Sequence, residues 1–155
     1  MMERTVRTSA KALIIRDGKL AVVRIDDHGD VFYIMPGGGQ HAGELLPDTV
    51  EREVAEELGL RVKVCGLVFV IEGAQGERHH RVDLVFRCDV LGELASPDLH
   101  PDVNQTGIAW LDIAALNTAP LYPSRLRRAI MNLHAGRPCP VYLGNENMGD
   151  PEITD

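Results

Sequence analysis

The feature that most constrains this chain is an apolar run, a glycine loop and a helix signal that follow one another directly. The apolar run Val31 to Met35 leads into Pro36 and three successive glycines, Gly37 to Gly39. A helix is predicted over Leu46 to Leu58, because a proline is tolerated in its first turn and Gly59 is a typical C-terminal stop. The chain is therefore expected to pass from a strand through a permissive loop into a helix.

Further strands and a second helix are predicted around this segment. Ala10 to Ile15 and Leu20 to Ile25 are expected to pair antiparallel through the hairpin signal Asp17-Gly18. Later strands are expected at Arg61 to Ile71, His80 to Val90 and Ile108 to Leu111, and a helix at Ser124 to Leu133 with Ser124 as its N-cap. This order favours an α/β sandwich over a regular βαβ repeat.

The length and charge of the chain limit what kind of protein it can be. A chain of 155 residues fits one domain, predicted here as residues 1–144, followed by an acidic and flexible tail at residues 145–155. The formal net charge of -7 offers no basic surface for long nucleic acid. Without an apolar leader or membrane-spanning run, we expect a cytoplasmic protein with no membrane partner.

The cysteines do not indicate a disulfide framework or a zinc site. Cys65, Cys88 and Cys139 are odd in number and show no CxxC spacing. We therefore expect them to be free thiols.

The predicted central helix carries a cluster of carboxylates. Glu53, Glu56 and Glu57 stand at i, i+3 and i+4 and share one arc of the helix, while apolar residues occupy the adjoining arc. Clustered carboxylates suit Mg²⁺, which prefers oxygen ligands and is commonly shared with substrate phosphates. The glycines upstream have no side chains, so their backbone can approach a metal or a phosphate. Loop and helix together predict one phosphate-processing site.

The spacing of these residues resembles the signature of a known family. Gly38, five residues, Glu44, seven residues, Arg52-Glu53-Val54, one residue, Glu56-Glu57, one residue and Gly59-Leu60 match the complete Nudix box. The resemblance implies a Nudix-type α/β/α sandwich with a mixed, largely antiparallel sheet. It also implies a hydrolase that cleaves a nucleoside diphosphate linked to a further moiety, with Mg²⁺ as cofactor and Mn²⁺ as a substitute.

The same resemblance assigns roles to single residues. Glu53, Glu56 and Glu57, with a backbone carbonyl at Gly37, resemble the metal ligands of the family. Arg52 resembles the residue that orients the glutamates, and Glu44 a supporting carboxylate. One of the three helix glutamates could deprotonate the attacking water, although in this family the base can also lie outside the box. Water is the expected nucleophile, because no Ser, Cys or His of this region sits in an evident nucleophile motif.

Substrate contacts are predicted at Arg24, Tyr33, Gly38 and Gly39. Arg24 resembles a position where relatives bring an arginine to phosphate, against the alternative of a solvated strand-end arginine. Tyr33 is either an aromatic wall of the pocket or a core residue. The segment Leu121-Tyr122-Pro123 is expected to be core and helix entry rather than a base-stacking surface.

Two functions of different classes remain open at this point. The first is a pyrophosphohydrolase acting on a nucleoside triphosphate or its oxidised form, ADP-ribose or a nucleotide sugar. The second is a non-catalytic module that senses such a nucleotide, which the intact set of glutamates disfavours. The expected partner is a small nucleotide, and a homodimer is possible because dimers are the commonest assembly.

Overall fold

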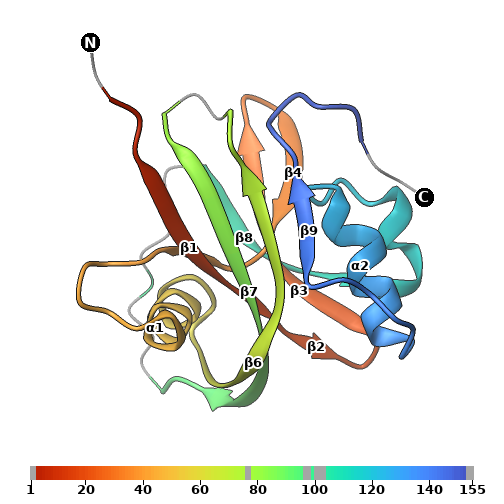
Figure 1. Ribbon diagram of the computed structural model, residues 1–155. Helices are drawn as coiled ribbons and strands as arrows, with labels where there is room; N and C mark the ends of the chain where they lie inside the picture. Colours follow the sequence, from red (N-terminus) through yellow and green to blue (C-terminus); the bar gives the residue numbers. More distant parts are fainter. Residues whose placement is uncertain (1–2, 76–77, 96–98, 100–103, 153–155) are drawn as a thin grey trace.

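The computed structural model describes residues 3–75, 78–95, 99 and 104–152, which form two β-sheets flanked by two helices (Figure 1). The strands of one sheet follow the order β5-β1-β7-β6-β9, with bounds β5 (Gly37–Gly39), β1 (Val6–Leu13), β7 (His80–Glu93), β6 (Leu60–Gly73) and β9 (Tyr142–Asn145). In the other sheet β3 (Lys19–Asp27) pairs with β2 (Ile15–Arg16), β4 (Asp30–Ile34) and β8 (Gln105–Asp112). The helices are α1 (Leu46–Leu58), α2 (Arg125–His134) and the short 3-10 helix η1 (Ile113–Thr118).

The sheets are mixed, as expected. The pairs β1–β7 and β6–β9 are parallel, and the other pairs between these strands are antiparallel. The α/β/α arrangement is therefore confirmed, with α1 and α2 on opposite sides of the strands (Figure 1). The strands are divided between two sheets where the sequence suggested one.

The predicted N-terminal hairpin is largely wrong. Only Ile15 and Arg16 pair antiparallel across Asp17-Gly18, with Leu20 and Lys19. The preceding strand β1 leaves for the other sheet and pairs with β7 along its whole length. In this pairing Ala10 and Ala12 of β1 lie in the core, where both are fully buried.

Helix α1 begins and ends at the predicted residues. Gly59 adopts the left-handed conformation with φ 66°, and its N–H donates to the carbonyl of Ala55 at 3.1 Å. This closes the helix as a C-terminal glycine does. The apolar side of α1 buries Val50, Val54 and Leu58 against the core and leaves the acidic side free for a site.

Two apolar clusters fill the space around the strands. Alternate residues of β3 divide between them, with Val23 in the cluster next to α1 and Val22 in the cluster next to α2. A continuous apolar strand thus has both faces buried, since successive side chains point to opposite faces. Strand β3 is therefore packed on both sides, towards α1 and towards α2.

The start of α2 is satisfied by a distant side chain. Ser124 does not act as the predicted side-chain cap; its hydroxyl and its N–H both donate to Glu146, at 3.0 and 2.6 Å. The N–H of Arg125 donates to the same carboxylate at 3.0 Å. Glu146 is only 7% exposed, and a carboxylate suits the positive end of a helix.

The segment expected to be a flexible tail is integrated with the domain where it begins. Strand β9 runs through Asn145, past the predicted boundary, and Glu146 is buried against α2. Glu152 also accepts bonds from Tyr122 and Arg127. The last predicted tail residues, 153–155, lie outside the described residues. Among the described helices, none is both long and apolar enough to cross a bilayer.

Candidate active site

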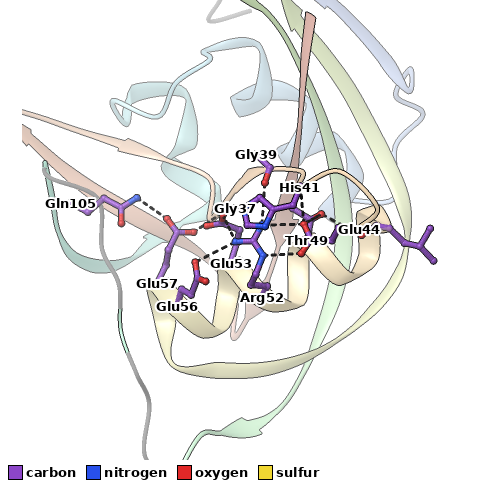
Figure 2. A network of polar contacts seen from close by, with 11 residues as sticks. Gly37, Gly39, His41, Glu44, Thr49, Arg52, Glu53, Glu56, Glu57 and Gln105 are labelled. Atoms are coloured by element: carbon purple, nitrogen blue, oxygen red, sulfur yellow. Dashed lines mark hydrogen bonds and ion pairs between the residues drawn. The ribbon is translucent and has the colours of Figure 1, made fainter.

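One guanidinium organises the acidic face of α1 (Figure 2). Arg52 Nε and Nη2 donate to the two carboxylate oxygens of Glu44 at 2.8 and 3.1 Å. Arg52 Nη1 contacts Glu53 at 3.0 Å and Glu56 at 3.4 Å, and Nη2 also reaches the carbonyl of Gly39 at 3.1 Å. The planar fork of an arginine is suited to such multiple carboxylate contacts. Arg52 therefore joins the helix to the glycine loop.

Glu44 closes the other end of this loop. Besides Arg52, it accepts bonds from the hydroxyl of Thr49 at 2.6 Å and from the N–H of His41 at 3.1 Å. The bonds from Arg52, then those from Thr49 and His41, hold the pKa of Glu44 well below its usual range. Glu44 in turn raises the pKa of Arg52 above its ordinary value. The pair is thus ionised and fixes the path of the loop.

Glu57 differs from the other glutamates because it lies deeper. Its carboxylate accepts the N–H of Gly37 at 2.7 Å and the side-chain amide of Gln105 at 2.7 Å (Figure 2). Burial raises the pKa of Glu57 to about 7, against the opposing effects of the Gly37 N–H, the Lys11 charge and Gln105. Bound positive charge at this point would favour the ionised form.

The glycines of β5 are required by close packing. A Cβ on Gly38 would meet the carboxylate of Glu53 at 2.5 Å, and one on Gly37 would meet the carbonyl of Ala10 at 2.2 Å. Gly37 also has φ 137°, a conformation that side chains disfavour. The loop can therefore lie directly on the acidic helix.

A second region is a pocket of about 530 Å³, whose lining includes no residue of α1 or β5. Lys11 links the two regions, because it lines the pocket and its charge also acts on Glu57. The walls come from β4, β6, β7, the start of α2 and the C-terminal segment, and include Phe32, Ile71, Asp83 and Tyr122. Its size and mostly apolar walls fit a small organic ligand.

Comparison with known proteins assigns the family of this chain. The sequence model of the NUDIX domain matches residues 5–133, which is most of the chain. The chain belongs to the Nudix family. The expectation of a Nudix enzyme agrees with this membership.

Three similar proteins illustrate this family membership. A Mycobacterium tuberculosis protein named as a candidate mutator protein, MutT4, is 34% identical over 139 residues, covering 81% of this chain and 52% of that protein. An ADP-ribose pyrophosphatase of Methanocaldococcus jannaschii is 34% identical over 89 residues, 56% of this chain and 53% of that protein. This chain spans about half the length of these two curated relatives. The E. coli ORF135 protein shares the fold, with TM-score 0.70 and 22% identity over 88% of this chain and 96% of that one.

Nudix hydrolases generally use a divalent metal ion, and the carboxylates of α1 have the donor chemistry for one. Glu53, Glu56 and Glu57 offer oxygen ligands on one face, next to a loop with no side chains. Among the described residues, no three acidic, histidine or cysteine side chains converge as ligands in the present arrangement. Glu53 and Glu56 are instead turned to Arg52, and Glu57 to Gly37 and Gln105.

The structure brings most of the residues of the Nudix box together. Gly37, Gly38 and Gly39 lie against α1, and Arg52, predicted to orient the glutamates, directly contacts Glu44, predicted as a supporting carboxylate. The predicted metal ligands lie on the same face of α1, around Arg52 and Gly37 (Figure 2).

The two predicted substrate contacts outside the Nudix box do not line the pocket. Arg24 donates to the hydroxyl of Thr106 at 2.5 Å on the neighbouring strand. Tyr33 packs against the cluster next to α2, whereas its neighbour Phe32 lines the pocket. Adjacent strand residues point to opposite faces, so Phe32 lies on the face of β4 that borders the pocket and Tyr33 on the other face.

Sequence reasoning missed three parts of the site. Tyr122, which we assigned to core or helix entry, lines the pocket beside Phe32, with ring centroids 6.1 Å apart. Gln105 and the C-terminal residues Glu146 to Glu152 were not singled out. No local signal marks these residues, because each reaches the site only through distant chain pairing.

Proposed function

We propose that this protein hydrolyses a phosphoanhydride bond in a nucleoside-diphosphate-linked small molecule, with Mg²⁺ as the metal ion. The observation that carries the proposal is the Arg52 network, which gathers Glu44, Glu53 and Glu56 beside the half-buried Glu57. The candidate substrates are a nucleoside triphosphate or its oxidised form, ADP-ribose, or a nucleotide sugar. A relative named as an ADP-ribose pyrophosphatase supports this class.

The division of charge supports a two-part site. The α1 face is acidic and would repel phosphates by itself, so it needs a cation to accept them. A bound Mg²⁺ ion supplies charge that offsets the phosphates and makes water a stronger nucleophile. The pocket beside it accommodates the rest of the substrate, and Lys11 lies at the junction where a phosphate would pass.

The protein residues then have distinct tasks. Glu53, Glu56 and Glu57 would hold the ion, and one of them accepts the proton of the attacking water. Arg52 and Glu44 are positioning residues, since they fix the helix and loop relative to each other. Gly38 and Gly39 leave backbone groups accessible to phosphate oxygens, because neither carries a side chain. Direct displacement by water at phosphorus is the expected course.

A substrate panel tests the proposal. Purified protein is incubated with nucleoside triphosphates, oxidised triphosphates, ADP-ribose, dinucleoside polyphosphates and nucleotide sugars, with Mg²⁺ or after exhaustive chelation. We expect Mg²⁺-dependent phosphoanhydride cleavage of at least one compound. Tight nucleotide binding without any turnover would overturn the proposal and favour the sensing module.

Arg52 provides a sharper variant for the same assay. Arg52→Lys keeps the charge, but one ammonium cannot reach the carboxylates of Glu44 and Glu53 and the Gly39 carbonyl together. We expect kcat to fall by about tenfold or more, or roughly 1.4 kcal/mol. Arg61→Lys, on an exposed position of β6, is the matched control.

A further inference from the structure

A buried carboxylate stands in the pocket wall without a complete set of partners. Asp83 lies on β7 and is 4% exposed. Its Oδ2 accepts a bond from Arg81 Nε at 2.8 Å, while its Oδ1 has no hydrogen-bond partner among the described residues. Leaving a buried acceptor unsatisfied is costly, so such an oxygen is normally paired with water or a ligand. The pocket is the open space that Asp83 borders.

The surroundings of Asp83 favour a planar ring with a hydrogen-bond donor. Phe32 and Tyr122 supply aromatic walls, and Ile71 and Leu126 supply aliphatic ones. Such walls suit the faces of a nucleobase. Among the buried side-chain atoms of the described residues that line the pocket, Asp83 Oδ1 lacks a partner and could accept one N–H of the base edge.

The charge of the pocket points the same way. Acidic side chains outnumber basic ones around it, with the five acids Asp27, Asp83, Glu146, Asp150 and Glu152 against Lys11 and Arg81. Phosphates are disfavoured in such a lining and would lie instead towards Lys11 and the α1 face. A donor-bearing base is the part of a nucleotide that this end of the pocket can accept.

We propose that Asp83 is a specificity-determining residue that accepts a hydrogen bond from the exocyclic amino group of a nucleobase. The inference rests on the proposed function for the identity of the ligand as a nucleotide. It goes further by selecting amino-bearing bases over otherwise equal bases that lack the group. Arg81 holds the carboxylate through Oδ2 and does not occupy Oδ1.

Matched nucleotide pairs test this without turnover. Nucleoside 5′-monophosphates are titrated calorimetrically in Mg²⁺ as three pairs: guanosine with inosine, adenosine with unsubstituted purine riboside, and cytidine with uridine. A hydrogen bond to a charged group predicts that at least one amino-bearing member binds about 10- to 100-fold more tightly than its partner. Equal dissociation constants within all three pairs would overturn the inference.

Asp83→Asn assigns the preference to the residue. Asparagine can keep its oxygen on Arg81, which places its amide N–H₂ where Oδ1 was and removes the acceptor. We expect the affinity ratio within the selective pair to fall by about tenfold or more, while the member without the amino group changes by only a few-fold. A merely structural role would weaken both members alike. Asp89→Asn on the same strand, 61% exposed, is the matched control and should leave the ratio unchanged.

The outcomes separate this inference from the proposed function. Amino selectivity that depends on Asp83, in a protein that cleaves no compound of the panel, would contradict the hydrolase and sustain the inference. Cleavage of a panel compound with no selectivity within the pairs would support the hydrolase and contradict the inference about Asp83. Selectivity that survives Asp83→Asn in a folded protein would overturn the role given to Asp83.

Discussion

Replacing Glu146 by glutamine tests whether the C-terminal segment holds the domain together. Glutamine retains one oxygen, which can keep the bonds to the Ser124 hydroxyl and the Arg125 N–H. Its amide nitrogen then faces the Ser124 N–H, which now donates to the other carboxylate oxygen at 2.6 Å. One charge-assisted bond and the attraction between a carboxylate and the helix dipole are lost.

The expected destabilisation follows from these two losses. A hydrogen bond to a charged group contributes about 1.5–3 kcal/mol and the dipole about 0.3–1 kcal/mol, so the free energy of unfolding should fall by about 2–4 kcal/mol. For a chain of this size that is a decrease in Tm of about 5–15 °C.

Thermal unfolding of the metal-free protein, followed by circular dichroism, measures this effect. Asp150→Asn is the control, because it removes a carboxylate charge from the same segment at an exposed side chain. We expect a clearly smaller shift in Tm for this control. A Glu146→Gln shift no larger than that of Asp150→Asn would refute the view that the segment closes α2.

Three further predictions concern the acidic face. Glu57→Gln should lower kcat by about 100-fold or more without lowering Tm, since it removes a partly buried charge. The control Glu51→Gln, on the exposed side of α1, should leave kcat within a few-fold. Equal losses of kcat in both variants would contradict the division of the helix into an acidic and an exposed face. Gly38→Ala should reduce kcat/KM in steady-state kinetics, because its Cβ would lie 2.5 Å from Glu53. The control Gly66→Ala places its Cβ in open space and should leave kcat/KM unchanged. Chelation should abolish turnover and added Mg²⁺ should restore it, and full activity after verified metal removal would exclude this mechanism.

The sequence predicted those elements whose signals are local. The bounds of α1 coincide with the prediction because Gly59 ends the helix through its own backbone conformation. The spacing of the helix glutamates likewise predicted a shared face, since the geometry of a helix follows from residue number alone. The Nudix resemblance named Arg52 and Glu44 separately, and the structure brings them into contact at 2.8 Å.

Elements that depend on distant pairing were not predictable in this way. Strand β1 pairs with β7, far along the chain, and nothing in the residues of β1 specifies that neighbour. The role of Glu146 depends on β9 docking beside β6, which places an apparently solvated acid at the start of α2. On β4, periodicity predicted a strand but did not decide whether Phe32 or Tyr33 faces the pocket, because a shift of one residue exchanges the faces.

The acidic face and the pocket come from different parts of the sequence, and this affects how the substrate preference of such a protein can be changed. Nearly all of the reactive face comes from one continuous stretch, residues 37–57, whereas the pocket is assembled from segments spread between Lys11 and Glu152. A combinatorial library can therefore vary pocket positions on β4, β7 and the C-terminal segment while the acids stay untouched. The stretch of residues 37–57 would then pass unchanged from variant to variant, and ligand preference would change through separate substitutions of pocket residues.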